Sequence, residues 1–497
     1  MKEIQLSVFP AFNFLKKDSG NEDPEGNKRE KEKFARFSPI FNQTLTAVGP
    51  WILTILAGMT FGYSAILLPQ LKSGVENTFT ITKVEESWIA SLAALPMALG
   101  CIFGGISLAK FGRKTTHVII CLPMFLGWLL MFLAHDINMI FIGRFITGLM
   151  TGMVASACSV YIAETSDPSY RAFLLGLIVA CASLGIFFVH LFGTFLSWKL
   201  TALICSLFAL IAQIVIPFTA ESPSWLLSKD KVEEAAKSFQ WCRGDSEEAT
   251  KEFEAMLNQK NEQEKATERT KFKHLFVPEF LKPLGIICVY ISANQWSGIN
   301  AMPFYYIRIM KETIGDDIND YVATLVVDVV RCLMSLLASA LLKRYNRRPL
   351  AIISGFGAAG SLFVLSFYTY IVTVFPSIRS GYIPMACLIS FMIFVCIGFQ
   401  PLPWSLVGEL FPIKSRSIGG GLSSCIAFLA LLSIVKTMPD LFEMYNISGV
   451  FLIFAIVSLV GTIFVCFFLP ETKDKTLQEI EEEFRGKKKK FIENTRI

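Results

Sequence analysis

About twelve apolar stretches, each long enough to cross a bilayer as a helix, constrain this chain more than any other feature. Half of them lie between residues 48 and 219, and half lie between residues 281 and 470. Backbone that faces lipid must satisfy its own hydrogen bonds, so helices are the expected form of these stretches. The pattern therefore predicts an all-α membrane protein with about twelve transmembrane helices in two six-helix halves.

The composition supports a membrane protein and excludes several other classes. The chain is 53% hydrophobic and only 18% charged, whereas soluble domains are about a quarter charged. The formal net charge of +5 is too mild to indicate a nucleic-acid partner. Nearly all of the 12 cysteines lie in apolar stretches without a CxxC pair, and we interpret the 4 histidines as isolated structural residues. We therefore expect no metal, no cofactor and no disulfide framework.

Basic residues fall in alternate loops, which predicts the orientation in the membrane. The clusters lie at Lys28–Arg36, Lys110–Lys114, Lys343–Arg348 and Lys487–Lys490. Both termini and the long middle loop are then cytoplasmic. The expected segments are an N-terminal tail (1–47), a first six-helix bundle (48–219), a helical cytoplasmic loop (220–280), a second bundle (281–470) and a C-terminal tail (471–497). Asn446 opens a glycosylation sequon in an outward loop.

A polar cluster interrupts the apolar stretch near residues 281–307. It contains Asn294, Gln295 and Asn300, and polar groups at membrane depth normally face a bundle interior or a watery cavity. Gln295 and Asn300 would lie about 140° apart on an unbroken helix. Gly298 and a following proline mark a place where the helix can open. The amides suit a ligand rich in hydroxyl groups, although they could instead join helices to one another.

The two halves of the chain carry matching charged motifs. In the first half, Gly112-Arg113-Lys114 precedes Glu164, Arg171 and Glu221; in the second, Asn346-Arg347-Arg348 precedes Glu409, Arg416 and Glu471. An internal repeat of this kind suggests alternating access around a central site. The charges are either simple topology anchors or a cytoplasmic latch that closes when the carrier faces outward and breaks when it faces inward.

Six motifs in order resemble the sugar porter family of the major facilitator superfamily. They are Gly104-Gly105…Gly112-Arg113-Lys114, Gly143-Arg144-Phe145, Glu221-Ser222-Pro223, Asn294-Gln295-Trp296-Ser297-Gly298-Ile299-Asn300, Pro401-Leu402-Pro403-Trp404 with Glu409-Leu410-Phe411-Pro412, and Pro470-Glu471-Thr472. Within the family, the chain looks most like insect trehalose transporters and class III hexose carriers. The resemblance covers residues 46 to 484.

The resemblance implies that Gln295 and Asn300 reach a sugar, with Asn294 and Trp404 beside them. Beside what the resemblance implies, Gln400 could add a further amide, and Tyr305 is a candidate aromatic residue of an outer gate. The resemblance also implies the latch role for the charged motifs. Ala109, Ser224 and Cys396 stand where the family pattern has other residues.

Asp328 and Arg331 lie inside the eighth apolar stretch and allow two interpretations. Residues three apart are neighbours on a helix, so the pair could form a structural ion pair away from the ligand. The alternative is that Arg331, near a position that contacts the sugar in the family, points into the cavity and shifts the substrate preference toward an acidic or unusually polar ligand.

We expect a non-enzyme that carries a hexose or trehalose by facilitative uniport, because the first span has no carboxylate that could bind a coupled proton. A proton-coupled symporter and a transport-poor sugar sensor are the alternatives. The expected partners are a small sugar and the lipid bilayer, without nucleic acid. The protein is expected to be a monomer in the plasma membrane.

Overall fold

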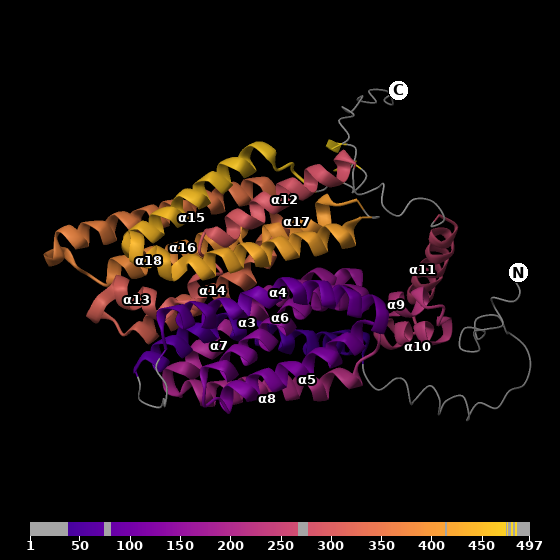
Figure 1. The fold of residues 1–497 in the computed structure, drawn as a ribbon. Helices are drawn as coiled ribbons and strands as arrows, with labels where there is room; N and C mark the ends of the chain where they lie inside the picture. The colour runs from indigo at the N-terminus through magenta and orange to yellow at the C-terminus, as the bar shows by residue number, and fades with distance from the viewer. Residues whose placement is uncertain are drawn as a thin grey trace, which may run out of the picture.

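The computed structural model describes residues 38–73, 81–266, 277–412, 415–473, 475, 479–480 and 483–484. The basic runs Lys28–Arg36 and Lys487–Lys490 lie outside these residues. Two groups of long helices lie side by side, with the helices labelled α9, α10 and α11 (residues 223–266) at one end (Figure 1).

The first bundle consists of six helices, all apolar enough to span a membrane. Polar caps explain several of their starts: Thr82 forms a capping box with Glu85, and Asp136 accepts a hydrogen bond from the Met139 amide at 2.9 Å. The helices are α3 (Pro39–Ser73), α4 (Lys83–Phe111), α5 (Arg113–Phe132), α6 (Ile137–Thr165), α7 (Pro168–Phe195) and α8 (Trp198–Val215), the last continued by η2 (Ile216–Phe218).

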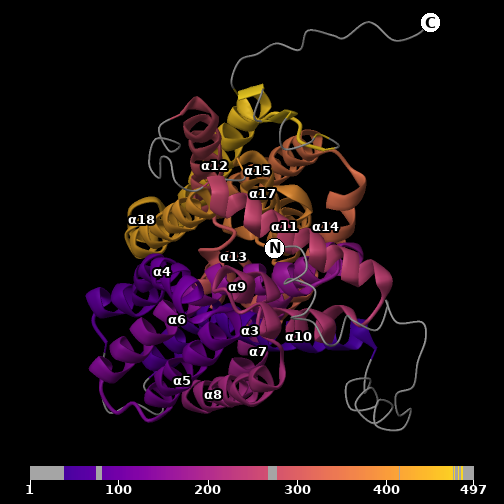
Figure 2. The ribbon, with the colours of Figure 1, turned by 90° about the vertical axis from the view of Figure 1, so that its right-hand side faces the viewer.

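Three linker helices follow, namely α9 (Pro223–Ser228), α10 (Val232–Arg243) and α11 (Glu247–Ala266). They have a small apolar core of their own, which includes Leu227, Phe239 and Phe253. Gln43 at the start of α3 donates to the Cys242 carbonyl at 3.0 Å and thereby ties α10 to the first bundle. We call this end of the molecule, which faces the viewer in Figure 2, the α9 end.

The second bundle is less regular than the first, because two of its spans are broken. Its helices are α12 (Pro278–Trp296), η4 (Met302–Phe304), α13 (Tyr306–Ile314), η5 (Gly315–Asp317), α14 (Asp320–Arg344), α15 (Arg347–Val374), η6 (Pro376–Ile378), α16 (Tyr382–Phe394), the π-helical turn η7 (Val395–Phe399), α17 (Leu402–Leu410) and α18 (Arg416–Phe468). We call the opposite end of the molecule, where α13 lies, the α13 end (Figure 1).

The described residues contain 10 helices that are long and apolar enough to cross a membrane. One of them, α18, has 53 residues and is interrupted at Asn446, so it corresponds to two predicted spans. The predicted seventh span is divided between α12 and α13 and is not among the ten. The structure is therefore consistent with about twelve spans in two halves.

The two bundles contact each other along α4 and α18 and along α7 and α14. Near the α13 end, Lys83 forms a salt bridge of 2.7 Å with Glu443, and the ammonium of Lys436 lies 3.8 Å from the centre of the Trp88 ring. Deeper in the molecule, the rings of Phe61 and Phe304 meet edge to face. These contacts link the bundles at the α13 end.

Candidate functional site

The first break in the second bundle lies at Gly298, directly after α12. Its φ of +90° is in the left-handed region that favours glycine. A Cβ atom at this position would lie 2.5 Å from the Phe454 ring, so α18 packs directly against the turn. The chain then runs through η4 into α13. The sequence-based expectation of an opening near Gly298 is confirmed by this geometry.

The second break is the π-helical turn η7 in the tenth span, which ends where Pro401 follows Gln400. Ser354 of α15 stabilises this turn, because its hydroxyl accepts a hydrogen bond from the Phe399 amide at 2.6 Å. Asn294 of α12 donates to the Phe399 carbonyl at 2.9 Å. The side chain of Asn294 therefore connects the two breaks, which is the helix-joining role considered for the amides.

A chain of hydrogen bonds links three of the predicted site residues. The Asn300 side-chain amide donates to Oε1 of Gln295 at 2.9 Å, and Arg331 donates from Nη2 to Oδ1 of Asn300 at 3.2 Å. Gln295 and Arg331 are 2% and 3% exposed. The turn at Gly298 makes this contact possible, because Gln295 and Asn300 would point in different directions on an unbroken helix.

The other predicted site residues do not join this chain within the described part of the molecule. Trp404 lies on α17 and is 37% exposed. Gln400 accepts a hydrogen bond from the Cys396 thiol at 3.4 Å. Tyr305 is buried and donates its hydroxyl to the Val435 carbonyl at 3.0 Å, and this contact anchors the start of α13 to α18.

Asp328 does not pair with Arg331, so the first of the two interpretations, an ion pair within the helix, is wrong. Oδ2 of Asp328 lies 2.5 Å from Nδ1 of His190 on α7 of the other bundle. Arg331 instead donates to the Ile299 carbonyl at 3.2 Å and to Asn300. The physical reason is that His190 provides a partner for the carboxylate, while the broken turn leaves carbonyl groups that need donors. This contact also corrects the expectation that His190 is isolated.

Arg144 lies inside an apolar stretch and has no role among those predicted from the sequence. Its side chain is fully buried in the first bundle. It donates to the Thr60 carbonyl at 3.0 Å, to the Ile89 carbonyl at 3.2 Å and to the Ser64 hydroxyl at 2.5 Å. Its charge at membrane depth is the sequence signal that marks Arg144 as a functional candidate.

The charged motif of the first bundle forms a compact network at the α9 end. Arg113 makes two parallel hydrogen bonds of 2.7 Å to the carboxylate of Glu164. Glu221 accepts hydrogen bonds from the backbone amides of Arg113 and Lys114 at 2.7 and 3.0 Å. Arg171 donates to the Ser166 carbonyl at 3.2 Å rather than to a carboxylate of the motif.

The second bundle repeats this network at equivalent positions. Arg347 forms a salt bridge of 3.2 Å with Glu409, and Glu471 accepts hydrogen bonds from the backbone amides of Arg347 and Arg348 at 3.0 and 3.1 Å. The Arg348 guanidinium contacts the Cys466 carbonyl. Arg416 begins α18, but its side chain lies outside the described residues.

Both ion pairs join residues of a single bundle. A latch of the predicted kind would therefore have to break within each bundle rather than between the two. That role stays a prediction.

Burial alone would raise the pKa of Glu471, but four backbone N–H groups donate to its carboxylate. These belong to Lys473, Arg347, Arg348 and Thr472, and together they hold the pKa below its ordinary value. Glu471 is thus held as a carboxylate where the chain leaves the second bundle.

Asn446, the predicted glycosylation site, is exposed and interrupts α18. Its φ of +53° and ψ of 178° are non-helical and mark the kink. Its use as an acceptor stays a prediction.

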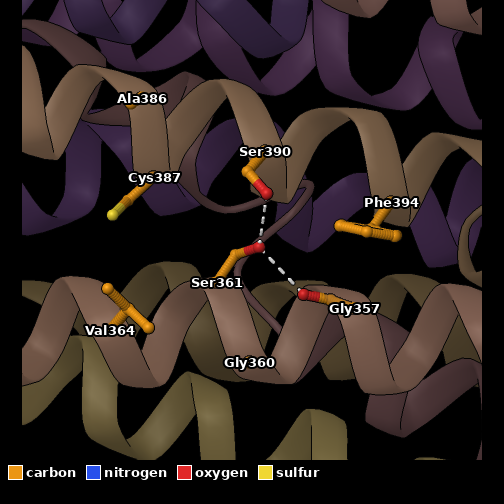
Figure 3. A pocket seen from close by; sticks show the side chains of 8 residues that line it. All are labelled: Gly357, Gly360, Ser361, Val364, Ala386, Cys387, Ser390 and Phe394. Atoms are coloured by element: carbon orange, nitrogen blue, oxygen red, sulfur yellow. Dashed lines mark hydrogen bonds between the residues drawn. The ribbon is translucent and has the colours of Figure 1, made fainter.

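A hollow of about 410 Å³ lies between α15 and α16 (Figure 3). Its lining includes Val364, Cys387 and Phe394, and Ser361 and Ser390 form a hydrogen bond of 2.9 Å across it. Its lining does not include Gln295, Asn300 or Arg331, so we do not assign it to the polar cluster.

Comparisons with known proteins agree with the resemblance seen in the sequence. The model of the family described as "Sugar (and other) transporter" matches residues 21–484. The facilitated trehalose transporter Tret1 of Bombyx mori is 31% identical over 469 residues, covering 94% of this chain and 90% of the relative. Tret1 of Apis mellifera ligustica is 30% identical, covering 89% of this chain and 88% of the relative.

Solved structures of the xylose transporter XylE share the fold. The structure of this proton:xylose symporter with 6-bromo-6-deoxy-D-glucose has a TM-score of 0.73 and 20% identity, covering 90% of this chain and 100% of the other. An inward-open structure from E. coli has the same TM-score, 18% identity and the same coverage. These neighbours confirm the major facilitator fold.

The family is one of transporters, which bears out the expectation of a non-enzyme. Its family and its spanning helices together make the chain a multi-pass integral membrane protein. The chain belongs to the sugar transporter family, among the sugar porters of the major facilitator superfamily.

Proposed function

We propose that this protein is a facilitative carrier that moves a hexose or trehalose across the membrane by uniport and alternating access. The observation that carries the sugar site is the chain of hydrogen bonds through Gln295 and Asn300 at the break beside Gly298. Both amides have donor and acceptor atoms, which suits the hydroxyl groups of a sugar. The printed names of the insect relatives favour trehalose as one candidate substrate.

Uniport is supported by the surroundings of Arg144. A proton-coupled carrier needs a titratable carboxylate that can exchange its proton during the cycle. Arg144 instead contacts the hydroxyl of Ser64 and two backbone carbonyls, and its described partners include no carboxylate. A serine hydroxyl does not titrate near neutral pH, so this contact offers no site for a coupled proton.

A proton-coupled symporter is the second candidate, and the His190–Asp328 pair favours it. Nδ1 of His190 lies 2.5 Å from Oδ2 of Asp328, and Nε2 of the same ring lies 3.2 Å from the Gly62 carbonyl oxygen. The pair thus places an imidazole and a carboxylate, two groups able to exchange protons, in a buried position at the contact between the bundles.

We propose the plasma membrane as the location, with both termini and the α9 end on the cytoplasmic side and a monomer as the working unit. The contacts near the α13 end then close the outward side of the carrier in this state. The basic residues around Arg113 and Arg347 support this orientation.

The decisive experiment is uptake of labelled glucose and trehalose into proteoliposomes, with and without an inward proton gradient. Uniport predicts equilibration to the same internal concentration in both cases. Accumulation that an uncoupler abolishes would establish symport instead, and its loss in Asp328→Asn would assign the proton to the His190–Asp328 pair. Sugar binding without any uptake would favour the sensor interpretation.

A further inference from the structure

The guanidinium of Arg331 is a buried cation that lacks an anionic partner among the described residues. The side chain is 3% exposed, and its two hydrogen bonds go to the neutral oxygens of Ile299 and Asn300. Its Nε atom has no hydrogen-bond partner within the described part of the chain. Burying an isolated charge costs several kcal/mol or more, so such a group normally pairs with an opposite charge.

Asp328, the nearest carboxylate along the helix, does not supply that charge. Its Oδ2 atom lies 2.5 Å from Nδ1 of His190 on α7, and no salt bridge joins it to Arg331 among the described residues. The guanidinium of Arg331 is therefore left without a carboxylate in contact with it.

The position of Arg331 places this charge at the predicted sugar site. Its Nη2 atom contacts the same Asn300 that donates to Gln295. The helix that carries Arg331, α14, also packs against the π-helical turn η7. Arg331 thus lies where the broken seventh and tenth spans approach each other.

We propose that the preferred substrate of this carrier is an anionic sugar, of the hexuronate class, whose carboxylate pairs with Arg331. This inference rests on the proposed function of the Gln295–Asn300 site as a sugar site. The amides would bind the ring hydroxyls, and the guanidinium would bind the carboxylate through Nε and Nη2, in the forked geometry that arginine prefers. A neutral hexose would leave the charge uncompensated.

The test compares D-glucuronate with D-glucose, because the two sugars differ only in the carboxylate at C6. The full-length protein is purified, binding of both sugars is measured by thermal stabilisation, and uptake is measured in proteoliposomes. In the wild type, the dissociation constant for glucuronate is expected to be at least about tenfold lower than that for glucose, a difference of about 1.4 kcal/mol. In Arg331→Gln, this preference should disappear while glucose binding persists.

Arg331→Lys keeps the positive charge and should keep part of the preference for glucuronate. If Arg331→Gln proves unstable, the lysine variant still shows whether the charge determines this preference. Arg308→Gln is the matched control, because Arg308 pairs with Glu312 on the surface of α13, outside the polar cluster. It should leave the ratio of the two dissociation constants unchanged.

The wild-type ratio decides the inference without any variant. Glucose or trehalose that is taken up while glucuronate binds no better than glucose would overturn the anionic-substrate inference and leave the proposed function standing. Failure to bind or take up all three sugars would overturn the proposed function itself. An unchanged preference for glucuronate in Arg331→Gln would refute the pairing of the carboxylate with Arg331.

Discussion

Replacing Gly298 by alanine tests the idea that a left-handed turn creates the sugar site. Alanine at a φ of +90° costs about 1–2 kcal/mol in backbone strain. Its Cβ atom would also lie 2.5 Å from the Phe454 ring and 3.2 Å from the Met302 side chain, and overpacking of this kind costs about 1–3 kcal/mol. The total expected destabilisation is about 2–5 kcal/mol.

Gly285→Ala is the matched control, because Gly285 lies in α12, in the same span, where an added Cβ atom would meet open space. Alanine there should stabilise the helix by up to about 1 kcal/mol. Thermal unfolding of the two purified variants in detergent, followed by intrinsic fluorescence, measures the difference. We expect the Tm of Gly298→Ala to lie several degrees below both the wild type and the control.

Sugar binding gives the second readout of the same experiment. A displaced turn would separate Gln295 from Asn300, so Gly298→Ala should bind sugar more weakly while Gly285→Ala binds normally. Equal melting temperatures and equal sugar affinities for the two variants would refute the reasoning, because the turn would then tolerate a side chain.

Three further predictions concern the site and the networks. Gln295→Ala and Asn300→Ala should each raise the dissociation constant for sugar about tenfold, for about 1.4 kcal/mol, at normal surface expression; unchanged affinity in both would place the site elsewhere. Asp328→Asn and His190→Gln should each lower the Tm, and the double variant should lose less than the sum of the two, whereas strict additivity in this double-mutant cycle would show that the pair is not coupled. Glu471 has a lowered pKa in the folded state, so its stabilising contribution is present above its ordinary pKa of 4.5 and is lost as the pH falls through the lower folded value. The acid-side fall in Tm should therefore be shallower in Glu471→Gln, and identical profiles would exclude this contribution.

The sequence predicted the fold and the broken seventh span, because both depend on local signals. Stretches of bilayer length indicate helices, and Gly298 inside a polar cluster indicates a break. Asp328 shows the limit of local reasoning. Because residues three apart are neighbours on a helix, Arg331 was the expected partner of Asp328. In the structure its partner is His190, which is 138 residues away in the chain. Only the packing of α7 against α14 brings that partner close.

Arg144 illustrates the same limit from the other side. Its motif was recognised, but its partners are two backbone carbonyls and a serine hydroxyl that have no charge pattern in the sequence. The charged motifs were easier to predict, because the same arginine and glutamate recur in both halves of the chain. Arg113 pairs with Glu164 in the first bundle, and Arg347 pairs with Glu409 in the second. The environment of Trp404, which depends on how the second break orients α17, could not be read from its neighbours in the chain.

The repeated ion-pair networks also determine where the equilibrium between inward and outward states can be adjusted. If each bundle rocks as a rigid body, it carries its own salt bridges with it, and Arg113–Glu164 and Arg347–Glu409 would contribute the same free energy to both states. Such contributions would cancel, whereas the predicted latch requires that these pairs break within a bundle. Under rigid rocking, the thermodynamic bias comes from contacts between the bundles, such as Lys83–Glu443 and His190–Asp328. Added salt should therefore shift the population through the exposed Lys83–Glu443 pair, and a further shift in a variant that lacks this pair would point to the latch at the α9 end.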